Sequence, residues 1–295
     1  APHTVGYESN EDLDNGFRPP GLIRLSTTTG PSPEYLRDFG SVTSAGTTTH
    51  HLTMYRATSG ALVFGAGTIQ WAWGLDEEHD GVRSPADPAM QQATVNLLAD
   101  MGAQPTTLMG DLDPAAMSTD FTAPSVTIAS PANGTSVANG AAVTVTGTAV
   151  DAGSGRVAGI EVSTDGGATW HPAEGTSPWS YTFHSNGPGS QVVKVRAVDD
   201  SGNIGQAPAT VGLTLTGPST LFGQRVPAVP ATDDAGAVTL GVRFVPQNDG
   251  TVTGVRFYDL TRIFATIEEP LYFDGCCHVN AHGSQIMARE IAARI

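Results

Sequence analysis

The sequence is poor in basic residues and especially in lysine. Its 295 residues include a single lysine, Lys194, and 29 acidic residues outnumber 14 basic ones. Of the net charge of −15, −10 falls in residues 1–122, which hold 15 acidic and 5 basic residues. Such a surface repels the phosphates of nucleic acids and of anionic lipids. The charge balance therefore argues against nucleic acid as a partner and against an anionic membrane surface.

Long apolar runs and separated cysteines are also lacking. No apolar run reaches the roughly 20 residues of a membrane-spanning helix, so no span is predicted. The two cysteines, Cys276 and Cys277, are adjacent, and we expect free thiols because a disulfide between neighbours is strained. The first residues show no basic start followed by an apolar run, so we expect no signal peptide in this sequence. We expect that one was removed from a secreted protein, or that the chain begins in mid-protein.

Glycine and proline are abundant, with 35 and 20 residues, and together with many β-branched residues they favour a β-rich chain with many turns. The clearest element is a hairpin over residues 157–172. Two apolar-alternating runs flank Asp165-Gly166-Gly167, whose glycines can adopt the positive φ angles of a tight turn.

Seven short runs of strand-forming residues include this hairpin and are separated by turn clusters. They are residues 125–130, 141–150, 157–164, 168–172, 179–184, 191–199 and 209–216. Their number and spacing predict an immunoglobulin-like β-sandwich over residues 123–217. Trp170 or Trp179 is the expected buried aromatic residue of its core. Asp199 and Asp200 are interpreted either as calcium ligands or as an ordinary acidic turn.

The N-terminal third follows a different pattern. Residues 1–60 are polar and show no sustained period, which predicts loops. An apolar run over residues 61–75 predicts a buried strand. A helix is then predicted with Asp87 as its N-cap, Pro88 at its first position and Gly102 as its stop signal. A buried strand that leads into a helix indicates the end of an α/β domain.

Three segments of this region resemble a known family: GYESNEDLDNGFRPPGLI, HLTMYRATSGALVFGAGTIQWAWGLD and ATVNLLADMG. Together they resemble the C-terminal part of the large subunit of N,N-dimethylformamidase and its relatives. This resemblance implies a truncated, glutamine-amidotransferase-like α/β domain over residues 1–122. It also implies amidohydrolase activity that depends on iron held by a tyrosine and two glutamates. Tyr7 and Glu8 are the positions to examine for these ligands, with surface loop residues as the alternative.

Other residues of this region carry nitrogen and oxygen ligands of the kinds that bind zinc or iron. They are His50-His51 and the acidic run Asp76-Glu77-Glu78-His79-Asp80. Adjacent ligands on a loop rarely converge on one ion, so the alternative is a set of solvated side chains. No cofactor is expected in the chain as it stands. Iron is expected only if missing sequence or a partner subunit completes the dimethylformamidase-like site.

The motif IEVSTDGGATWHPA is similar to bacterial immunoglobulin-like modules, including those attached to molybdenum-dependent sulfite-oxidase-type enzymes. In those proteins the sandwich mediates dimerisation or acts as a spacer, and the chemistry lies elsewhere. The resemblance implies a spacer or interaction module here, with a protein partner or a second copy of the chain.

The last segments resemble two further families. Residues 218–258 resemble the start of a secreted bacterial β-sandwich domain of unknown function. Residues 259–295 resemble the last block of SGNH (GDSL-type) hydrolases, followed by a terminal helix. His278 matches the histidine that deprotonates the serine of that family, and Asp274 precedes it by four residues instead of three. No block with the serine nucleophile is recognised.

The sequence therefore predicts a multidomain, mainly β protein. We expect the non-catalytic part of a secreted bacterial protein that is related to the dimethylformamidase large subunit. One alternative is an amidohydrolase completed by missing sequence or a partner subunit, and the other is an SGNH-type esterase that uses His278 and Asp274. Bound iron with formamide hydrolysis favours the first alternative, and serine labelling by an organophosphate favours the second.

Overall fold

The computed structural model describes residues 3–6, 8–37 and 40–217. Ala1–Ser219 forms one compact unit. Several predictions lie outside the described residues: the segments 218–258 and 259–295, the site residues Tyr7, Asp274 and His278, and the thiols Cys276 and Cys277. Across the described part of the chain, no helix combines the length and the apolar character needed to cross a membrane.

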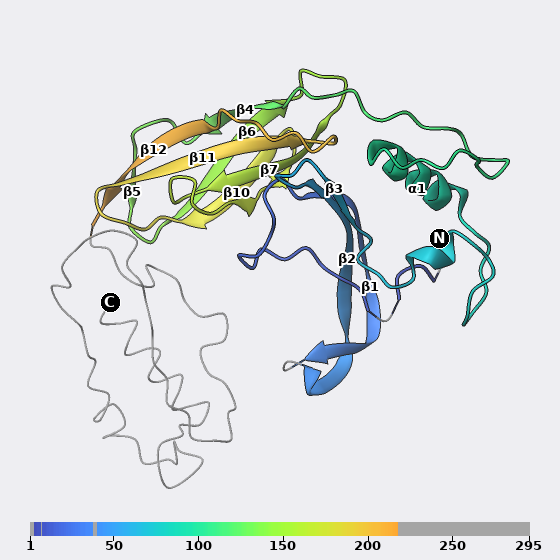
Figure 1. The fold of residues 1–295 in the computed structure, drawn as a ribbon. Coiled ribbons are helices and arrows are strands. Elements are labelled where there is room, and N and C mark those ends of the chain that lie inside the picture. Colours follow the sequence, from blue (N-terminus) through green and yellow to red (C-terminus); the bar gives the residue numbers. More distant parts are fainter. Residues whose placement is uncertain (1–2, 7, 38–39, 218–295) are drawn as a thin grey trace, which may run out of the picture. The chain divides into compact units, whose positions relative to one another are not determined.

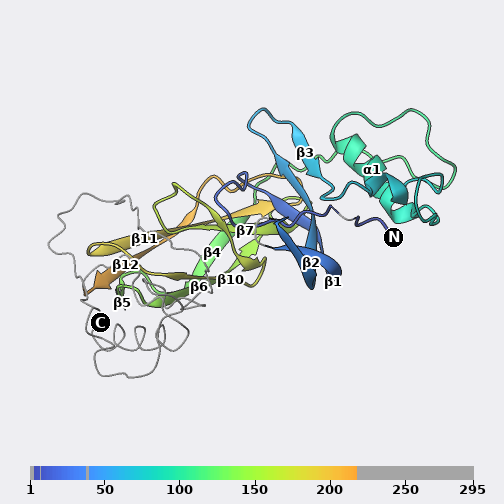
Figure 2. The same ribbon diagram turned by 90° about the horizontal axis from the view of Figure 1, so that it is seen from below.

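The mainly β character is confirmed, and residues 125–216 form two sheets that face each other (Figures 1 and 2). The strand order is β4-β6-β10-β9 in one sheet and β5-β12-β11-β7-β8 in the other. The bounds are β4 Ser125–Ser130, β5 Thr135–Ala138, β6 Ala142–Val150, β7 Val157–Ser163, β8 His171–Pro172, β9 Glu174–Gly175, β10 Trp179–His184, β11 Ser190–Asp199 and β12 Ala209–Thr216. All seven predicted strands are present, and the short β5 and β9 are additional.

The core of the sandwich lies between these two sheets. Alternate residues of the long strands point inward, as with Val143 and Val145 on β6 and Val193 and Val195 on β11. Trp179 lies in this core with 2% of its surface exposed. Trp170 is half-buried outside the core, where its ring stacks against a guanidinium group. The structure thus selects Trp179 as the core aromatic residue.

The predicted hairpin is confirmed. β7 pairs antiparallel with β8, with Glu161 opposite Pro172 and Val162 opposite His171. Gly166 and Gly167 have φ angles of 78° and 105°, a region in which a side chain would be strained.

The Asp165 carboxylate organises the turn of this hairpin. It accepts hydrogen bonds from the backbone N–H groups of Ala168 and Thr169 and from the hydroxyls of Ser163 and Thr169. Partial burial opposes its ionisation, but the bonds from Thr169, Ser163 and Ala168 outweigh that effect and lower the pKa of Asp165 to about 2.

Replacing Asp165 by alanine should lower the free energy of unfolding at neutral pH by about 1 kcal/mol, a value discounted for solvent screening of the partly exposed carboxylate. Because the folded-state pKa is depressed, the advantage of the wild type is present above pH 3.8 and is lost as the pH falls toward 2. Thermal unfolding of both proteins at neutral pH and within that window tests this. A difference that does not shrink in acid, or an equal loss for the exposed control Asp111→Ala, would contradict it.

The N-terminal region corrects two predictions. The predicted loops of residues 1–60 contain a long antiparallel hairpin of β1 (Ile23–Arg37) and β2 (Val42–Arg56), and β3 (Leu62–Gly65) pairs with β2. The hairpin was missed because both of its faces carry threonines and other polar residues, so no apolar alternation marks it. The predicted buried strand is a short edge strand, and its Val63 is exposed.

The predicted helix is confirmed as α1, Pro88–Asp100, and it follows a short 3₁₀ turn, η2, at Trp71–Gly74. The side chain of Asp87 caps it by accepting bonds from the N–H groups of Ala89 and Met90. Gly102 ends it with a φ angle of 71°. Because the preceding strands pair antiparallel only, the described residues do not show the predicted glutamine-amidotransferase-like α/β segment, which stays a prediction.

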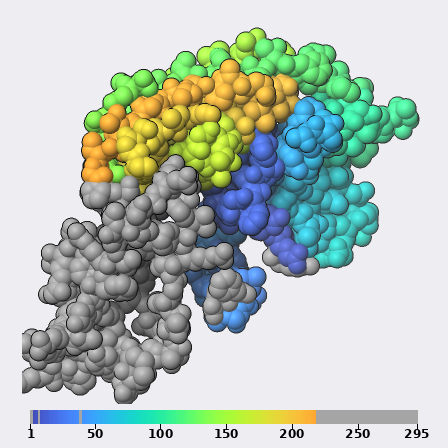
Figure 3. Space-filling view, turned by 60° about the vertical axis from the view of Figure 1, so that its left-hand side comes forward, coloured from blue at the N-terminus to red at the C-terminus, as the bar shows by residue number. Residues whose placement is uncertain are grey.

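A second, smaller apolar cluster connects the N-terminal region to the sandwich. It consists of Ile23, Met54 and Val198, with the partly buried Leu62, Leu97, Ala158 and Ile204 packed against them. Gly21 lies at the closest approach: with a φ angle of 73°, a Cβ there would lie 2.7 Å from Cδ1 of Ile204. The space-filling view shows the blue N-terminal residues in contact with the sandwich (Figure 3).

Candidate functional site

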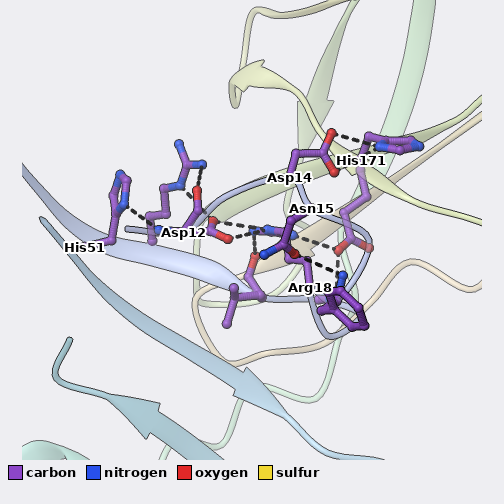
Figure 4. Close-up of polar contacts among 11 residues, drawn as sticks. Asp12, Asp14, Asn15, Arg18, His51 and His171 are labelled. Carbon is purple, nitrogen blue, oxygen red and sulfur yellow. Dashed lines mark hydrogen bonds and ion pairs between the residues drawn. The ribbon is translucent and has the colours of Figure 1, made fainter. Parts of the chain in front are cut away.

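The segment of residues 10–22, which we call the entry segment, leads directly into the start of β1 at Ile23. It lines a hollow of about 270 Å³ together with residues of β2, among them His51 and Thr53. Phe17 and Leu13 also line this hollow and remain largely exposed. Most of the charged groups beside the hollow are engaged in one network (Figure 4).

The network begins at Asp12, whose side chain is only 3% exposed. Both of its carboxylate oxygens accept bonds from Nε of Arg18, at 3.0 and 3.1 Å. Oδ2 also accepts a 2.8 Å bond from Nε of Arg24. Arg18 donates a further bond to the carbonyl oxygen of Leu22, which fixes the end of the entry segment.

Glu161 of β7 binds the entry segment to the sandwich. Its Oε1 accepts bonds from the backbone N–H of Gly21, at 2.9 Å, and from Nη1 of Arg18, at 3.2 Å. Its Oε2 accepts a 2.8 Å bond from Nε of Arg196 on β11, and the guanidinium of Arg196 stacks on Trp170 with its carbon 4.0 Å from the ring centre. Glu161 is 2% exposed, so this carboxylate joins the two regions inside the protein.

A second polar contact between the entry segment and the sandwich lies closer to solvent. Nδ1 of His171 is 2.8 Å from Oδ2 of Asp14. The His171 ring stacks near Tyr181, and burial together with the charge of Asp14 raises the pKa of Tyr181. These contacts attach the other side of the entry segment to the sandwich.

The two adjacent histidines of β2 do not share an ion. Neighbouring residues of a strand point to opposite faces, and each histidine has its own partner. Nδ1 of His51 accepts a 2.9 Å bond from the backbone N–H of Asp12, and Nε2 of His50 bonds to the carbonyl oxygen of Ala66. Burial, and then the charge of Arg24, lowers the pKa of His51, so this ring is neutral at pH 7.

The acidic run after η2 is engaged in local contacts. Glu78 pairs with Arg83 at 2.8 Å, with both side chains exposed. His79 stacks on Trp73 at 4.5 Å and bonds to the carbonyl oxygen of Asp80. Glu8 is exposed. Within the described ranges, none of these side chains belongs to a group of three ligands close enough to hold one ion.

The contacts at this site attach the entry segment to the sandwich. Its buried charges compensate one another, and the lining residues that belong to the described part of the chain include no serine, cysteine or lysine. Sequence reasoning missed Asp12, Arg18, Glu161 and Arg196. One signal was available, since a glutamate inside the apolar run VAGIEVS indicates a buried charge that requires a partner.

Three family models match separate parts of the chain. Residues 1–84 match the model of the N,N-dimethylformamidase beta subunit-like C-terminal region. Residues 124–195 match the bacterial Ig domain, and residues 224–273 match a domain of unknown function. The third match extends past Tyr258 into the predicted SGNH-type block, which stays a prediction. A search of curated proteins finds no match.

Solved structures give distant similarities. The fibronectin(III)-like modules of Clostridium thermocellum CbhA are 13% identical, with a TM-score of 0.31, over 65% of this chain and 79% of that one. Domains 4 and 5 of the S-layer protein SbsC are 22% identical, with a TM-score of 0.23, over 32% and 54%. CopC from Methylosinus trichosporium OB3b is 21% identical, with a TM-score of 0.21, over 31% and 93%.

Proposed function

We propose that this chain is the non-catalytic part of a secreted, multidomain bacterial protein related to dimethylformamidase. In this proposal the immunoglobulin-like sandwich is a spacer and interaction module that holds the dimethylformamidase-like region in a fixed position. The matches over residues 1–84 and 124–195 support the presence of both regions in one chain. A protein partner or a second copy of the chain is the partner class that such a module would take.

The observation that carries this proposal is the buried ion-pair network between the entry segment and β7. A flexible tether between two regions needs no buried charges, and burying a carboxylate is costly unless it is paired and hydrogen-bonded. Here Glu161 is buried and receives bonds from Gly21, Arg18 and Arg196. Such an arrangement is stable in one relative position of the two regions only.

Distances between spin labels test the fixed position. With Cys276 and Cys277 replaced by serine, labels at Thr28→Cys on β1 and Ser136→Cys on β5 should give one narrow distance distribution. Arg18→Met should broaden it, because Glu161 then loses one partner and the entry segment its anchor. Arg83→Met, which removes an exposed ion pair, is the matched control. A broad distribution in the unsubstituted protein would contradict a fixed spacer.

The alternative function is formamide-type C–N hydrolysis, completed by further sequence or a partner subunit. The match of residues 1–84 favours it, since that family model carries the dimethylformamidase name. Elemental analysis and a formamide hydrolysis assay distinguish the two functions. Stoichiometric iron with turnover supports the amidohydrolase, and their absence supports the spacer. An SGNH-type esterase rests on Asp274 and His278, outside the described residues, and organophosphate labelling of a serine decides that case.

A further inference from the structure

Three aspartates from separate segments meet at one end of the sandwich. Asp120 belongs to the irregular segment that precedes β4, Asp151 directly follows β6, and Asp199 is the last residue of β11. One carboxylate oxygen of each lies within 4.8 Å of the others. We call this group the carboxylate triad. One of its residues belongs to the segment that connects α1 to β4, and the other two lie at the ends of β6 and β11, one strand from each sheet.

Asp120 and Asp199 are buried, Asp151 is half-buried, and no cation compensates the negative charge of the three among the described residues. Asp199 has no exposed surface, and Asp120 is 5% exposed. Both carboxylate oxygens of Asp151 expose less than 1 Å² each, and neither has a hydrogen-bond partner. No salt bridge within the described ranges joins any of the three to a cation. A buried carboxylate without a partner is costly unless a cation or a proton neutralises it, so this arrangement favours a positive ligand.

The existing hydrogen bonds leave room for that ligand. The Asp120 oxygens accept bonds from the N–H groups of Thr122 and Gly155, and the Asp199 oxygens accept bonds from Ser201 and Asn203. A carboxylate has about four lone-pair sites, so each aspartate retains acceptor capacity. Burial and the nearby charge of Asp120 raise the pKa of Asp199, which is consistent with repulsion inside the triad.

Two glycines keep the space around the triad free of side chains. A Cβ at Gly153 would lie 2.2 Å from Oδ1 of Asp120. At Gly155 it would lie 2.8 Å from Oδ2 of Asp120 and 3.2 Å from Oδ2 of Asp151. The loop after β6 thus wraps around the carboxylates with backbone alone, and any larger residue would enter the space between them.

We propose that the carboxylate triad binds one Ca²⁺ ion. The donor set contains only oxygen, which selects hard cations such as Ca²⁺ and Mg²⁺. Two ligands on opposite sides of Ca²⁺ lie about 4.8 Å apart, since each Ca–O distance is about 2.4 Å. The three donor oxygens lie within 4.8 Å of one another, so all of them can reach one ion at these distances. Mg²⁺ keeps several water ligands and is rarely held by a set of protein ligands alone, which favours Ca²⁺ for this site.

The bound ion fastens the connecting segment to the sandwich. Asp120 is held next to the ends of β6 and β11, so Ca²⁺ stiffens the link between α1 and β4. The sequence interpretation named both Asp199 and Asp200 as calcium ligands, and the proposed site contains only the first of them. Asp199 belongs to the site, whereas the Asp200 carboxylate accepts a bond from the N–H of Arg156 and lies 3.7 Å from its Nε.

Calorimetric titration of the full chain with CaCl₂, after treatment with EGTA, tests the proposal. One Ca²⁺ should bind, with a dissociation constant of roughly 10⁻⁴ to 10⁻³ M or tighter, as in extracellular modules. Saturating Ca²⁺ should raise the unfolding temperature by about 5 °C or more. Asp151→Asn should abolish both effects, and in EGTA it should be at least as stable as the wild type because one buried charge is gone. The exposed Asp111→Asn is the charge-matched control.

Three results would overturn the site. The first is no binding and no thermal shift up to about 10 mM Ca²⁺, well above the dissociation constants of known modules. The second is a shift of wild-type size in Asp151→Asn, which would place the ion elsewhere. The third is stabilisation by Mg²⁺ equal to that by Ca²⁺ at the same concentration, which would indicate general screening of charge.

Discussion

Replacing Glu161 by glutamine should lower the free energy of unfolding by about 3 to 5 kcal/mol, the cost of breaking a buried ion pair by removing one partner. Glutamine keeps the shape of the side chain, so the loss isolates its charge. Arg196 then lacks the carboxylate that neutralises it, and Arg18 retains Asp12 as its counter-ion. Urea unfolding followed by tryptophan fluorescence measures the change as a lower midpoint.

The matched control is Glu174→Gln on β9, because Glu174 is exposed and belongs to the same sandwich. This variant should change stability by less than about 0.5 kcal/mol. A loss below about 1 kcal/mol in Glu161→Gln would mean that water or a rearranged Arg196 replaces the lost interaction. In that event the network would not be the feature that fixes the entry segment.

Replacing Trp179 by alanine should cost about 3 to 5 kcal/mol, the usual range for truncating a large buried aromatic residue. Trp179 fills the space between the sheets, and its ring approaches Gly147 so closely that a Cβ there would lie 2.6 Å from Cζ2. The cavity left by alanine cannot be filled by a glycine. Guanidinium unfolding monitored by circular dichroism gives the change.

The control is Trp170→Ala, which makes the same substitution at a tryptophan outside the core. Trp170 is half-buried outside the core and interacts mainly through its stacking with Arg196, which predicts a loss of about 0.5 to 2 kcal/mol. Similar losses in the two variants would contradict the assignment of Trp179 as the core residue.

Local signals in the sequence predicted the elements that depend on local interactions. The turn of residues 165–167 needs glycines at positive φ, and α1 needs a cap at Asp87 and a stop at Gly102. Each requirement is met by residues close together in the chain. Pattern reading therefore identified the hairpin, the helix and seven of the nine strands of the sandwich.

Long-range contacts were not predictable in this way. Arg18 and Glu161 are 143 positions apart, and nothing near either residue indicates the other. The β1–β2 hairpin was missed for a related reason. Its cross-strand contacts include the Thr29 and Thr49 hydroxyls, 3.1 Å apart, and polar pairs of this kind leave no apolar period.

The first strand of the N-terminal sheet also bears on self-association. β1 is an edge strand, and a long edge with free N–H and C=O groups can recruit a strand from another molecule. Pro31 and Pro33 lie within β1 and have no N–H to offer, and the register with β2 shifts between Ser32 and Tyr35. These interruptions oppose edge-to-edge pairing, so the hairpin can extend into solvent without seeding aggregates.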